Sequence, residues 1–291
     1  MKQYVFCILL AGFCPTCQDS TTTVGDDALV SNLDGTLVFQ SNRTGNFEIF
    51  STNSSGTGIT NVSQNIFDDI YPTLSFNGAK LAYLSNQEGT RHIYVYQNNT
   101  STKITSADLE YDTPQMSHRG DKIVFIRNYN LFLMNSTGSG TTQLTFDSGD
   151  TVNYSPAFSY DDSKLVFTRN TNGGNSDIIL MNGLGGATQN MTDGIGDNLY
   201  PAFSPDDTQI VFSRNNHISI LSIATKSMTD LMPDDSLHFN GYPVFSPNGN
   251  TIAFVSNRTG NMDIFTMKTN GQGLKNITEN EAIDTRPYWS E

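Results

Sequence analysis

Cysteine is absent from this 291-residue chain after residue 17, because all three cysteines, Cys7, Cys14 and Cys17, lie at the N-terminal end. The rest of the chain can therefore form neither a disulfide framework nor a cysteine-based zinc site. Cys14 and Cys17 have the spacing of a redox or metal motif, but no βαβ pattern of the thioredoxin type follows them. Thiol chemistry is excluded for the body of the chain.

Positive charge is also scarce, with 16 Lys and Arg against 29 Asp and Glu and a formal net charge of -13. No run of Lys or Arg is longer than two residues. An acidic surface repels phosphate backbones and anionic lipid, so we expect no nucleic-acid partner and no electrostatic docking on a membrane. Long stretches with helical periodicity are missing too, and the Gly- and Asn-rich turns predict many short strands.

The N-terminus has the pattern of an export signal. Lys2 is followed by the short apolar run 5–13, which is too short to span a bilayer, so we assign residues 1–17 to a signal peptide. Cys17 is the candidate for lipidation, and residues 18–32 read as a polar tether. We therefore expect an exported protein, periplasmic or anchored at the outer membrane, that touches the membrane only through a lipid on Cys17.

An internal repeat organises the rest of the chain. An apolar triplet ending in an aromatic residue recurs six times, with the aromatic residues at Phe39, Tyr83, Phe125, Phe167, Phe212 and Phe254. A proline recurs in phase with it, and these six marker prolines are Pro72, Pro114, Pro156, Pro201, Pro243 and Pro287. Both series advance by 42 to 45 residues per step. Such a period is that of a propeller blade built from four short strands.

One unit shows the expected strands. They are Pro243–Ser246, Thr251–Ser256, Asp263–Met267 and Leu274–Thr278, separated by Gly- and Asn-containing turns. The first unit starts at its second strand, and the chain ends on an unpaired first strand at 286–290. Since a blade buries both faces only against neighbours, the array must close. We therefore predict an all-β, six-bladed propeller over residues 33–291, in which the C-terminal strand completes blade 1 beside Leu37–Ser41.

The repeat motif resembles the WD40-like (PD40) repeat of the TolB-like propellers. The matching segments are Ser41–Gly45, Ser204–Asp207, Ser246–Gly249 and Ile277-Thr278. The resemblance implies a binding scaffold of the cell envelope, with a part in envelope transport or integrity. TolB itself carries an α/β domain before its propeller, for which this chain has no comparable segment ahead of residue 33, and the Gly-x-Ser-x-Gly elbow of the propeller-bearing peptidases is absent.

Two polar positions precede each marker proline. Six-fold repetition places each set as a ring around the axis, where it can meet a ligand or hold loop backbone. Three residues before the proline stand Asp69, Tyr111, Asn153, Asn198, Asn240 and Asp284. One residue before it stand Tyr71, Thr113, Ser155, Tyr200, Tyr242 and Arg286. We predict partner binding at this mouth of the channel, above all by Tyr71, Tyr200, Tyr242 and Arg286.

Catalytic and metal-binding residues are sparse. The four histidines, His92, His118, His217 and His238, fall at non-equivalent positions in four blades, so they are not expected to converge. We predict no catalytic residue and no cofactor, with a structural cation such as calcium on Asp69 and Asp284 as an open alternative. The leading hypothesis is a monomeric propeller that binds a protein or peptide of the envelope. The alternative is a carbohydrate-binding or lyase propeller of the oligogalacturonate lyase kind, and Trp289 is expected to pack between blades.

Overall fold

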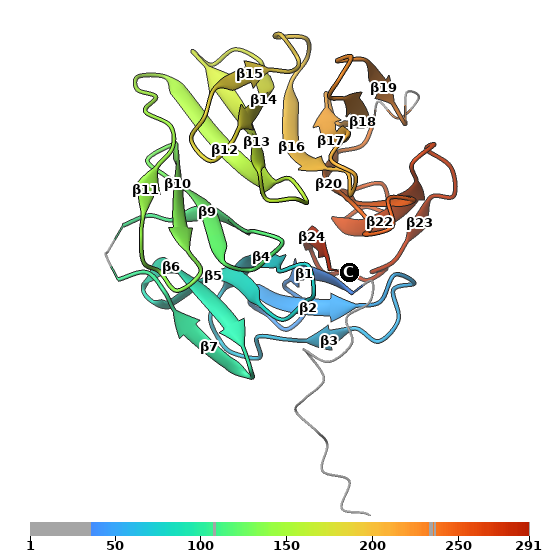
Figure 1. Cartoon of the computed structure of the whole chain (residues 1–291). Helices are drawn as coiled ribbons and strands as arrows, with labels where there is room; N and C mark the ends of the chain where they lie inside the picture. Colours follow the sequence, from blue (N-terminus) through green and yellow to red (C-terminus); the bar gives the residue numbers. More distant parts are fainter. Residues whose placement is uncertain (1–35, 107–108, 233–234, 236, 291) are drawn as a thin grey trace, which may run out of the picture.

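The computed structural model describes residues 36–106, 109–232, 235 and 237–290, and within these ranges all regular structure is β-strand. The strands form six four-stranded antiparallel sheets that stand around a central axis (Figure 1). This confirms the all-β, six-bladed propeller. The expected signal peptide, the tether and Cys17 lie outside the described residues, among which no helix is long and apolar enough to cross a membrane.

Every blade has the same strand order from the channel outward. The inner strands are β24 (Asp284–Trp289), β4 (Asp69–Leu74), β8 (Asp112–Met116), β12 (Thr151–Phe158), β16 (Asn198–Phe203) and β20 (Asn240–Phe245). The second strands are β1 (Leu37–Ser41), β5 (Leu81–Glu88), β9 (Lys122–Arg127), β13 (Lys164–Thr171), β17 (Gln209–Arg214) and β21 (Thr251–Ser256). The third strands are β2 (Glu48–Thr52), β6 (Thr90–Gln97), β10 (Asn130–Asn135), β14 (Ser176–Asn182), β18 (His217–Ser222) and β22 (Asp263–Lys268). The outer strands are β3 (Thr60–Asn61), β7 (Thr100–Lys103), β11 (Thr142–Gln143), β15 (Thr188–Asn190), β19 (Met228–Asp230) and β23 (Lys275–Asn276).

The ring closes as the repeat phase predicts. Strand β24 pairs antiparallel with β1, so that Trp289 faces Leu37 and Asp284 faces Ser41. Figure 1 shows β24, the last strand of the chain, beside β1. The C-terminal strand therefore completes blade 1, which gives the first and last parts of the chain one shared sheet.

The bounds of three strands in the last unit differ from the expectation, and for β22 (Asp263–Lys268) the difference is one residue at its end. Strand β20 begins at Asn240, three residues before the marker proline, because the loop entering it already pairs with β21. Strand β23 covers only Lys275–Asn276, since an outermost strand has a partner on one side only. The second strand, Thr251–Ser256, is as predicted.

The second strands form the buried layer of each blade. Their aromatic residues are almost fully buried, with five of them at 1% exposure or less: Phe39, Phe125, Phe167, Phe212 and Phe254. Burying a side chain of this size stabilises the fold by about 2–3 kcal/mol. Trp289 joins a cluster with Phe39 of its own blade and Ile264 of blade 6, so it packs between blades as expected.

Neighbouring blades are also tied through their hairpin turns. The Asp162 carboxylate of blade 4 accepts the backbone N–H groups of His118 and Arg119 in blade 3, at 2.7 and 2.9 Å. Burial favours the neutral acid, yet the His118 side chain and these backbone hydrogen bonds hold the pKa of Asp162 below its ordinary value. The contact between Asp162 and the His118–Arg119 backbone fixes the relative position of the inner strands of blades 3 and 4. It thereby helps to set the shape of the channel.

Candidate functional site

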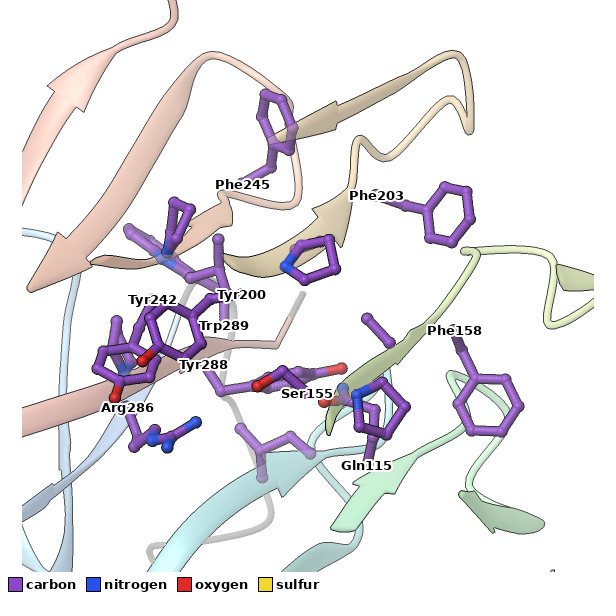
Figure 2. A pocket seen from close by; sticks show the side chains of 18 of the residues that line it. Gln115, Ser155, Phe158, Tyr200, Phe203, Tyr242, Phe245, Arg286, Tyr288 and Trp289 are labelled. Carbon is purple, nitrogen blue, oxygen red and sulfur yellow. The ribbon is translucent and has the colours of Figure 1, made fainter. Parts of the chain in front are cut away.

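The channel along the axis is lined by the inner strands of all six blades (Figure 2). The cavity volume available to water is about 130 Å³, roughly ten times the volume that one water molecule needs. The lining starts at the residue before each marker proline, which defines one mouth, and in blades 2 to 4 it reaches the hairpin turn at the other end. Arg286 is the only Lys, Arg, Asp or Glu among the described residues of this wall.

Each inner strand is interrupted by a β-bulge at its marker proline. The residue before the proline has a left-handed backbone in all six blades: Tyr71 (φ 57°), Thr113 (φ 39°), Ser155 (φ 50°), Tyr200 (φ 57°), Tyr242 (φ 53°) and Arg286 (φ 56°). This conformation costs a non-glycine residue about 1–3 kcal/mol. A bulge re-aims the side chain it carries. Six bulges thereby turn six side chains toward one mouth of the channel.

Three tyrosines surround the guanidinium of Arg286 at this mouth. The Arg286 Cζ atom lies 4.2 Å from the ring centroid of Tyr71, 4.0 Å from that of Tyr242 and 5.6 Å from that of Tyr200. Arg286 Nη2 donates to Tyr71 Oη at 3.2 Å, and the Tyr200 and Tyr242 ring centroids are 3.9 Å apart. Each cation–π contact is worth about 0.5–2 kcal/mol. The four side chains form one packed unit, which we call the tyrosine–arginine cluster.

The mouth is uneven because the remaining two positions carry small side chains. Thr113 and Ser155 belong to blades 3 and 4, whereas the tyrosine–arginine cluster comes from blades 5, 6, 1 and 2. Figure 2 shows Tyr200, Tyr242 and Arg286 grouped together, with Ser155 and Gln115 away from them. One half of the mouth is therefore filled by aromatic rings, and the other half is the wider entrance.

Three tyrosines of the channel wall, Tyr71, Tyr200 and Tyr288, stay protonated at neutral pH. Burial raises the pKa of Tyr71 above its ordinary value, against the opposing charge of Arg286. Burial, with Tyr242 as the next cause, raises the pKa of Tyr200 strongly. Tyr288, one residue past a marker proline, has its pKa raised to about 12 by burial, despite the side chains of Thr73 and Gln115. All three phenols remain neutral hydrogen-bonding groups.

The second predicted ring, three residues before each proline, does not reach the cavity. Its members are at most 6% exposed, and none lines the channel: Asp69, Tyr111, Asn153, Asn198, Asn240 and Asp284. Asn198 is typical, since its amide donates to the carbonyl oxygens of Ser176, Ile195 and Gly196. These side chains hold the inter-blade loops on the strands. Holding loop backbone is the second of the two roles that the repeat leaves open for this ring.

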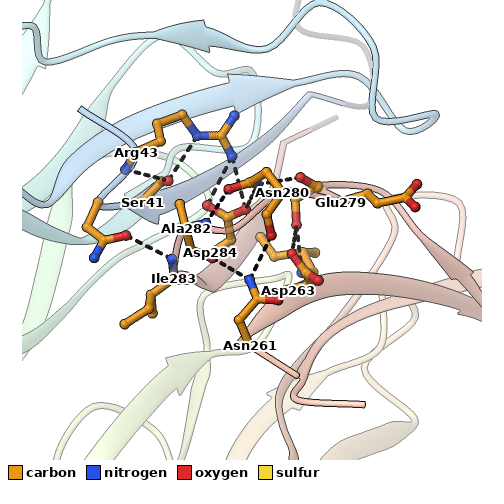
Figure 3. A network of polar contacts seen from close by, with 12 residues as sticks. Ser41, Arg43, Asn261, Asp263, Glu279, Asn280, Ala282, Ile283 and Asp284 are labelled. Carbon is orange, nitrogen blue, oxygen red and sulfur yellow. Dashed lines mark hydrogen bonds and ion pairs between the residues drawn. The ribbon is translucent and has the colours of Figure 1, made fainter. Parts of the chain in front are cut away.

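In three blades an arginine contacts the buried residue that stands three positions before the marker proline. This arginine lies near the end of the second strand or just after it. The pairs are Arg43 with Asp284, Arg169 with Asn153 and Arg258 with Asn240. Figure 3 shows the pair of blade 1, where Arg43 Nη2 donates to both Asp284 oxygens at 3.0 Å. Asn280 Nδ2 donates to Asp284 Oδ2 at 2.7 Å. The carboxylate is therefore neutralised inside the protein.

Asp69 of blade 2 is the second carboxylate of this ring, and it lacks an arginine partner among the described residues. Asn65 Nδ2 donates to its Oδ2 at 2.6 Å, but no Lys or Arg nitrogen of the described residues lies within 4.0 Å. Burial raises the pKa of Asp69 above its ordinary value, and the nearby Glu48 charge adds to the effect. Asp284 is committed to Arg43, and the described residues contain no group of three or more His, Cys, Asp or Glu suited to a metal ion. A calcium ion on Asp69 and Asp284 stays a prediction.

The four histidines lie apart, as their non-equivalent positions predict. His92 is buried against Thr105, with Nδ1 and Oγ1 3.1 Å apart. His217 Nδ1 is 2.7 Å from the Met232 carbonyl oxygen, and His238 Nδ1 is 2.5 Å from a carboxylate oxygen in the same loop. His118 alone lines the channel, at the end opposite the tyrosine–arginine cluster.

Exposed apolar side chains gather on one face of the ring. The six loops that enter the inner strands each carry one: Ile66, Leu109, Phe146, Ile195, Leu237 and Ile283, which are 40% to 88% exposed. All inner strands start at the same face, so these loops surround the mouth that holds the tyrosine–arginine cluster. We call this surface the loop face. On the opposite face, exposed large apolar side chains among the described residues are confined to Phe76, Leu184 and Leu274.

Comparison with known proteins places the fold. Residues 88–170 match the model of the dipeptidyl peptidase IV (DPP IV) N-terminal region, which covers less than half of the chain. No curated protein matches the sequence. The structure is similar to that of TolB from Acinetobacter baumannii, with a TM-score of 0.74 and 21% identity over 89% of this chain and 67% of that one.

Two further structures are similar. One is a putative TolB from Agrobacterium tumefaciens, with a TM-score of 0.67 and 16% identity over 90% of this chain and 100% of that one. The other is an oligogalacturonate lyase from Vibrio parahaemolyticus, with a TM-score of 0.55 and 13% identity over 83% of this chain and 71% of that one. At these identities the comparisons establish a TolB-like propeller fold. Any activity has to be argued from the residues of the site.

Proposed function

We propose that this chain is a non-enzymatic binding protein of the cell envelope that holds a protein partner on its loop face. The observation that carries the proposal is the ring of six exposed apolar side chains, one per inter-blade loop, around a mouth lined by three tyrosines. Large exposed apolar side chains concentrated on one face are typical of interaction surfaces. Tyrosine and arginine are the residues that most often dominate binding energy at such surfaces.

The shape of the surface favours a macromolecular partner. The apolar side chains belong to six separate loops, so a ligand that covers several of them must be broad. The strands and blade contacts hold these loops in place, and rigid scaffolds commonly present binding residues on loops in this way. A folded protein with a protruding segment can cover the loops and enter the mouth together.

The envelope location is supported by the export pattern at the N-terminus and by the TolB-like fold. We propose an exported, monomeric propeller, with a lipid on Cys17 as its one link to a membrane. A lyase is the less favoured reading, because the described channel wall contains one histidine and no Asp or Glu for proton transfer or metal binding. We also propose that the propeller takes part in envelope transport or integrity.

Two matched double variants test the proposal. Ile66→Ser with Leu237→Ser removes two apolar side chains of the loop face, whereas Leu184→Ser with Leu274→Ser removes two from the opposite face. Each protein is used to capture its partner from an envelope extract, and the partner is identified by mass spectrometry. We expect the first variant to retain less than about a tenth of the partner, and the second to match the wild type. Equal capture by both variants would reject the loop face as the binding surface.

A further inference from the structure

Arg286 has no anionic partner within the part of the chain that the structure describes. Among the described residues no carboxylate lies within 4.0 Å of it, and its single hydrogen bond goes to Tyr71 Oη. By contrast, Arg43, Arg169 and Arg258 each contact a carboxylate within 3.0 Å. Asp112, which opens the inner strand of blade 3, has its carboxylate turned to the backbone, where it accepts a hydrogen bond from the Thr113 N–H at 2.8 Å. In a chain with 13 excess negative charges, this partly buried guanidinium is left with donors facing the channel.

The tyrosines orient the guanidinium without neutralising it. The phenols of Tyr71 and Tyr200 stay protonated at neutral pH, because burial raises their pKa. Rings packed against a guanidinium restrict its motion, so the entropy cost of binding an anion is reduced. A carboxylate can approach from the wider half of the mouth, beside Thr113 and Ser155. It can then accept hydrogen bonds from the guanidinium N–H groups of Arg286 that do not bind Tyr71.

The wall below the mouth is apolar in blades 4 to 6, while Gln115 and Tyr288 stand at the same level in blades 3 and 1. Past the marker prolines, which carry no N–H group, blades 4 to 6 present Ala157, Ala202 and Val244 to the cavity. A ligand that fits both levels has a carboxylate at the mouth and an apolar group directly beneath it. A peptide's C-terminal residue has this arrangement, because its α-carboxylate and its side chain are attached to one Cα atom. An internal Asp or Glu does not, since neighbouring side chains of an extended chain point to opposite sides.

We propose that the mouth captures the carboxyl terminus of a partner polypeptide, with the terminal carboxylate on Arg286 and a bulky apolar terminal side chain in the channel. This inference rests on the proposed function and names the chemistry of the segment that its partner inserts. Capture of a free C-terminus by paired charge and a side-chain pocket is a recurring form of peptide recognition. The remainder of the peptide leaves over Thr113 and Ser155 and reaches the loop face.

Binding of synthetic peptides tests this directly. The probes are fluorescein-labelled Gly-Ser-Gly-Ala-Phe as the free acid, the same peptide as the carboxamide, and the free acid ending in Gly, each titrated up to 1 mM. With the wild type we expect the acid to bind about tenfold or more tighter than the carboxamide or the Gly-ended peptide. With Arg286→Gln the acid and the carboxamide should bind equally. Arg119→Gln, which removes one exposed positive charge elsewhere, is the matched control and should behave as the wild type.

Several results would overturn the inference. They are equal binding of acid and carboxamide by the wild type, a preference for the acid that survives Arg286→Gln, or no binding of the Phe-ended acid up to 1 mM. N-acetyl-phenylalanine binding as tightly as the pentapeptide would assign the site to small free acids instead. The acid–amide comparison uses the wild type, so it holds even where Arg286→Gln unfolds the protein. Should these tests fail while the Ile66/Leu237 variant still loses its partner, the proposed function stands and the C-terminal capture falls.

Discussion

Arg43 and Asp284 form an ion pair at 3.0 Å although 241 residues separate them along the chain. The aspartate opens the strand that completes blade 1, and the arginine follows the strand it pairs with. Ile283 N–H also donates to Asn42 Oδ1 at 2.8 Å across the same seam. Ring closure therefore rests on polar contacts at this end of the strand pair and on Trp289 at the other.

Arg43→Ala should lower the free energy of unfolding by about 3 kcal/mol, because it leaves the fully buried Asp284 carboxylate without its cation. We place the effect at the low end for buried pairs, since the Arg43 side chain is 21% exposed. Chemical denaturation measures the change. Lys103→Ala, which removes an exposed ion pair with Glu88, is the control and should leave the midpoint unchanged. Equal effects of both substitutions would argue against a special role for the seam.

Deleting residues 286–291 should abolish the cooperative thermal transition, since blade 1 loses most of its inner strand and Leu37 and Phe39 lose their cover. Trp289→Ala alone should cost about 3–5 kcal/mol because the side chain is 8% exposed within the core. Trp289→Phe is the milder control at about 1 kcal/mol, because the indole Nε1 has no hydrogen-bond partner among the described residues. Circular dichroism melting compares the three. A truncated chain that keeps the wild-type transition would contradict the closure.

Asp69→Asn should stabilise the protein at neutral pH, on the order of 1 kcal/mol, because it removes a buried charge with no cation nearby. Blades 4, 5 and 6 already carry Asn at this position. The folded pKa of Asp69 is raised above the ordinary value of 3.8, so the folded state binds more protons than the unfolded state between those two pH values. The penalty in the wild type is therefore fully present above the folded pKa and absent below 3.8.

Denaturation at several pH values measures this difference. The gap between Asp69→Asn and wild type should close as the pH falls through the raised pKa of Asp69. Asp284→Asn, at the same position in blade 1, should instead destabilise at neutral pH because it weakens the pair with Arg43. A destabilised Asp69→Asn protein at pH 7 would contradict the account of this site.

Gly56→Ala should destabilise the ring more than Gly45→Ala. Both glycines have positive φ, so both substitutions carry the strain of a left-handed backbone, about 1–2 kcal/mol. A Cβ atom on Gly56 would lie 2.3 Å from the Ile277 carbonyl oxygen of blade 6, whereas a Cβ on Gly45 meets nothing within 4 Å. The difference between the two unfolding midpoints isolates the contact between blades 1 and 6. Equal midpoints would mean that this turn moves freely.

The repeat allowed the blade count and the closure to be predicted from sequence, because two markers in phase leave one way to bury both faces of every blade. The bulges could not be predicted. Left-handed backbone is usually signalled by Gly, Asn or Asp, but here it falls on residues such as Tyr71 and Arg286. Their contact joins residues 215 apart and exists only because the ring closes.

The loop face had only a partial periodic signal in the sequence. Ile66, Ile195 and Leu237 each stand six residues before their marker prolines. Leu109, Phe146 and Ile283 stand five, ten and four residues before theirs. The ring of Asp69 and Asn198 had the periodic signal yet proved to be internal, since position in the repeat does not tell whether a polar group faces a ligand or loop backbone. Exposure had to come from the structure.

The central claim is that a partner binds at the tyrosine-lined mouth of the channel, and the combined Tyr71→Ala, Tyr200→Ala and Tyr242→Ala variant tests it most directly. Its affinity for the captured partner is measured by calorimetry beside the wild type, with circular dichroism to confirm that the propeller is intact. We expect a folded protein whose affinity is at least about a hundredfold lower, since the cluster of aromatic anchors is lost. A folded triple variant that binds the partner with wild-type affinity would contradict the claim.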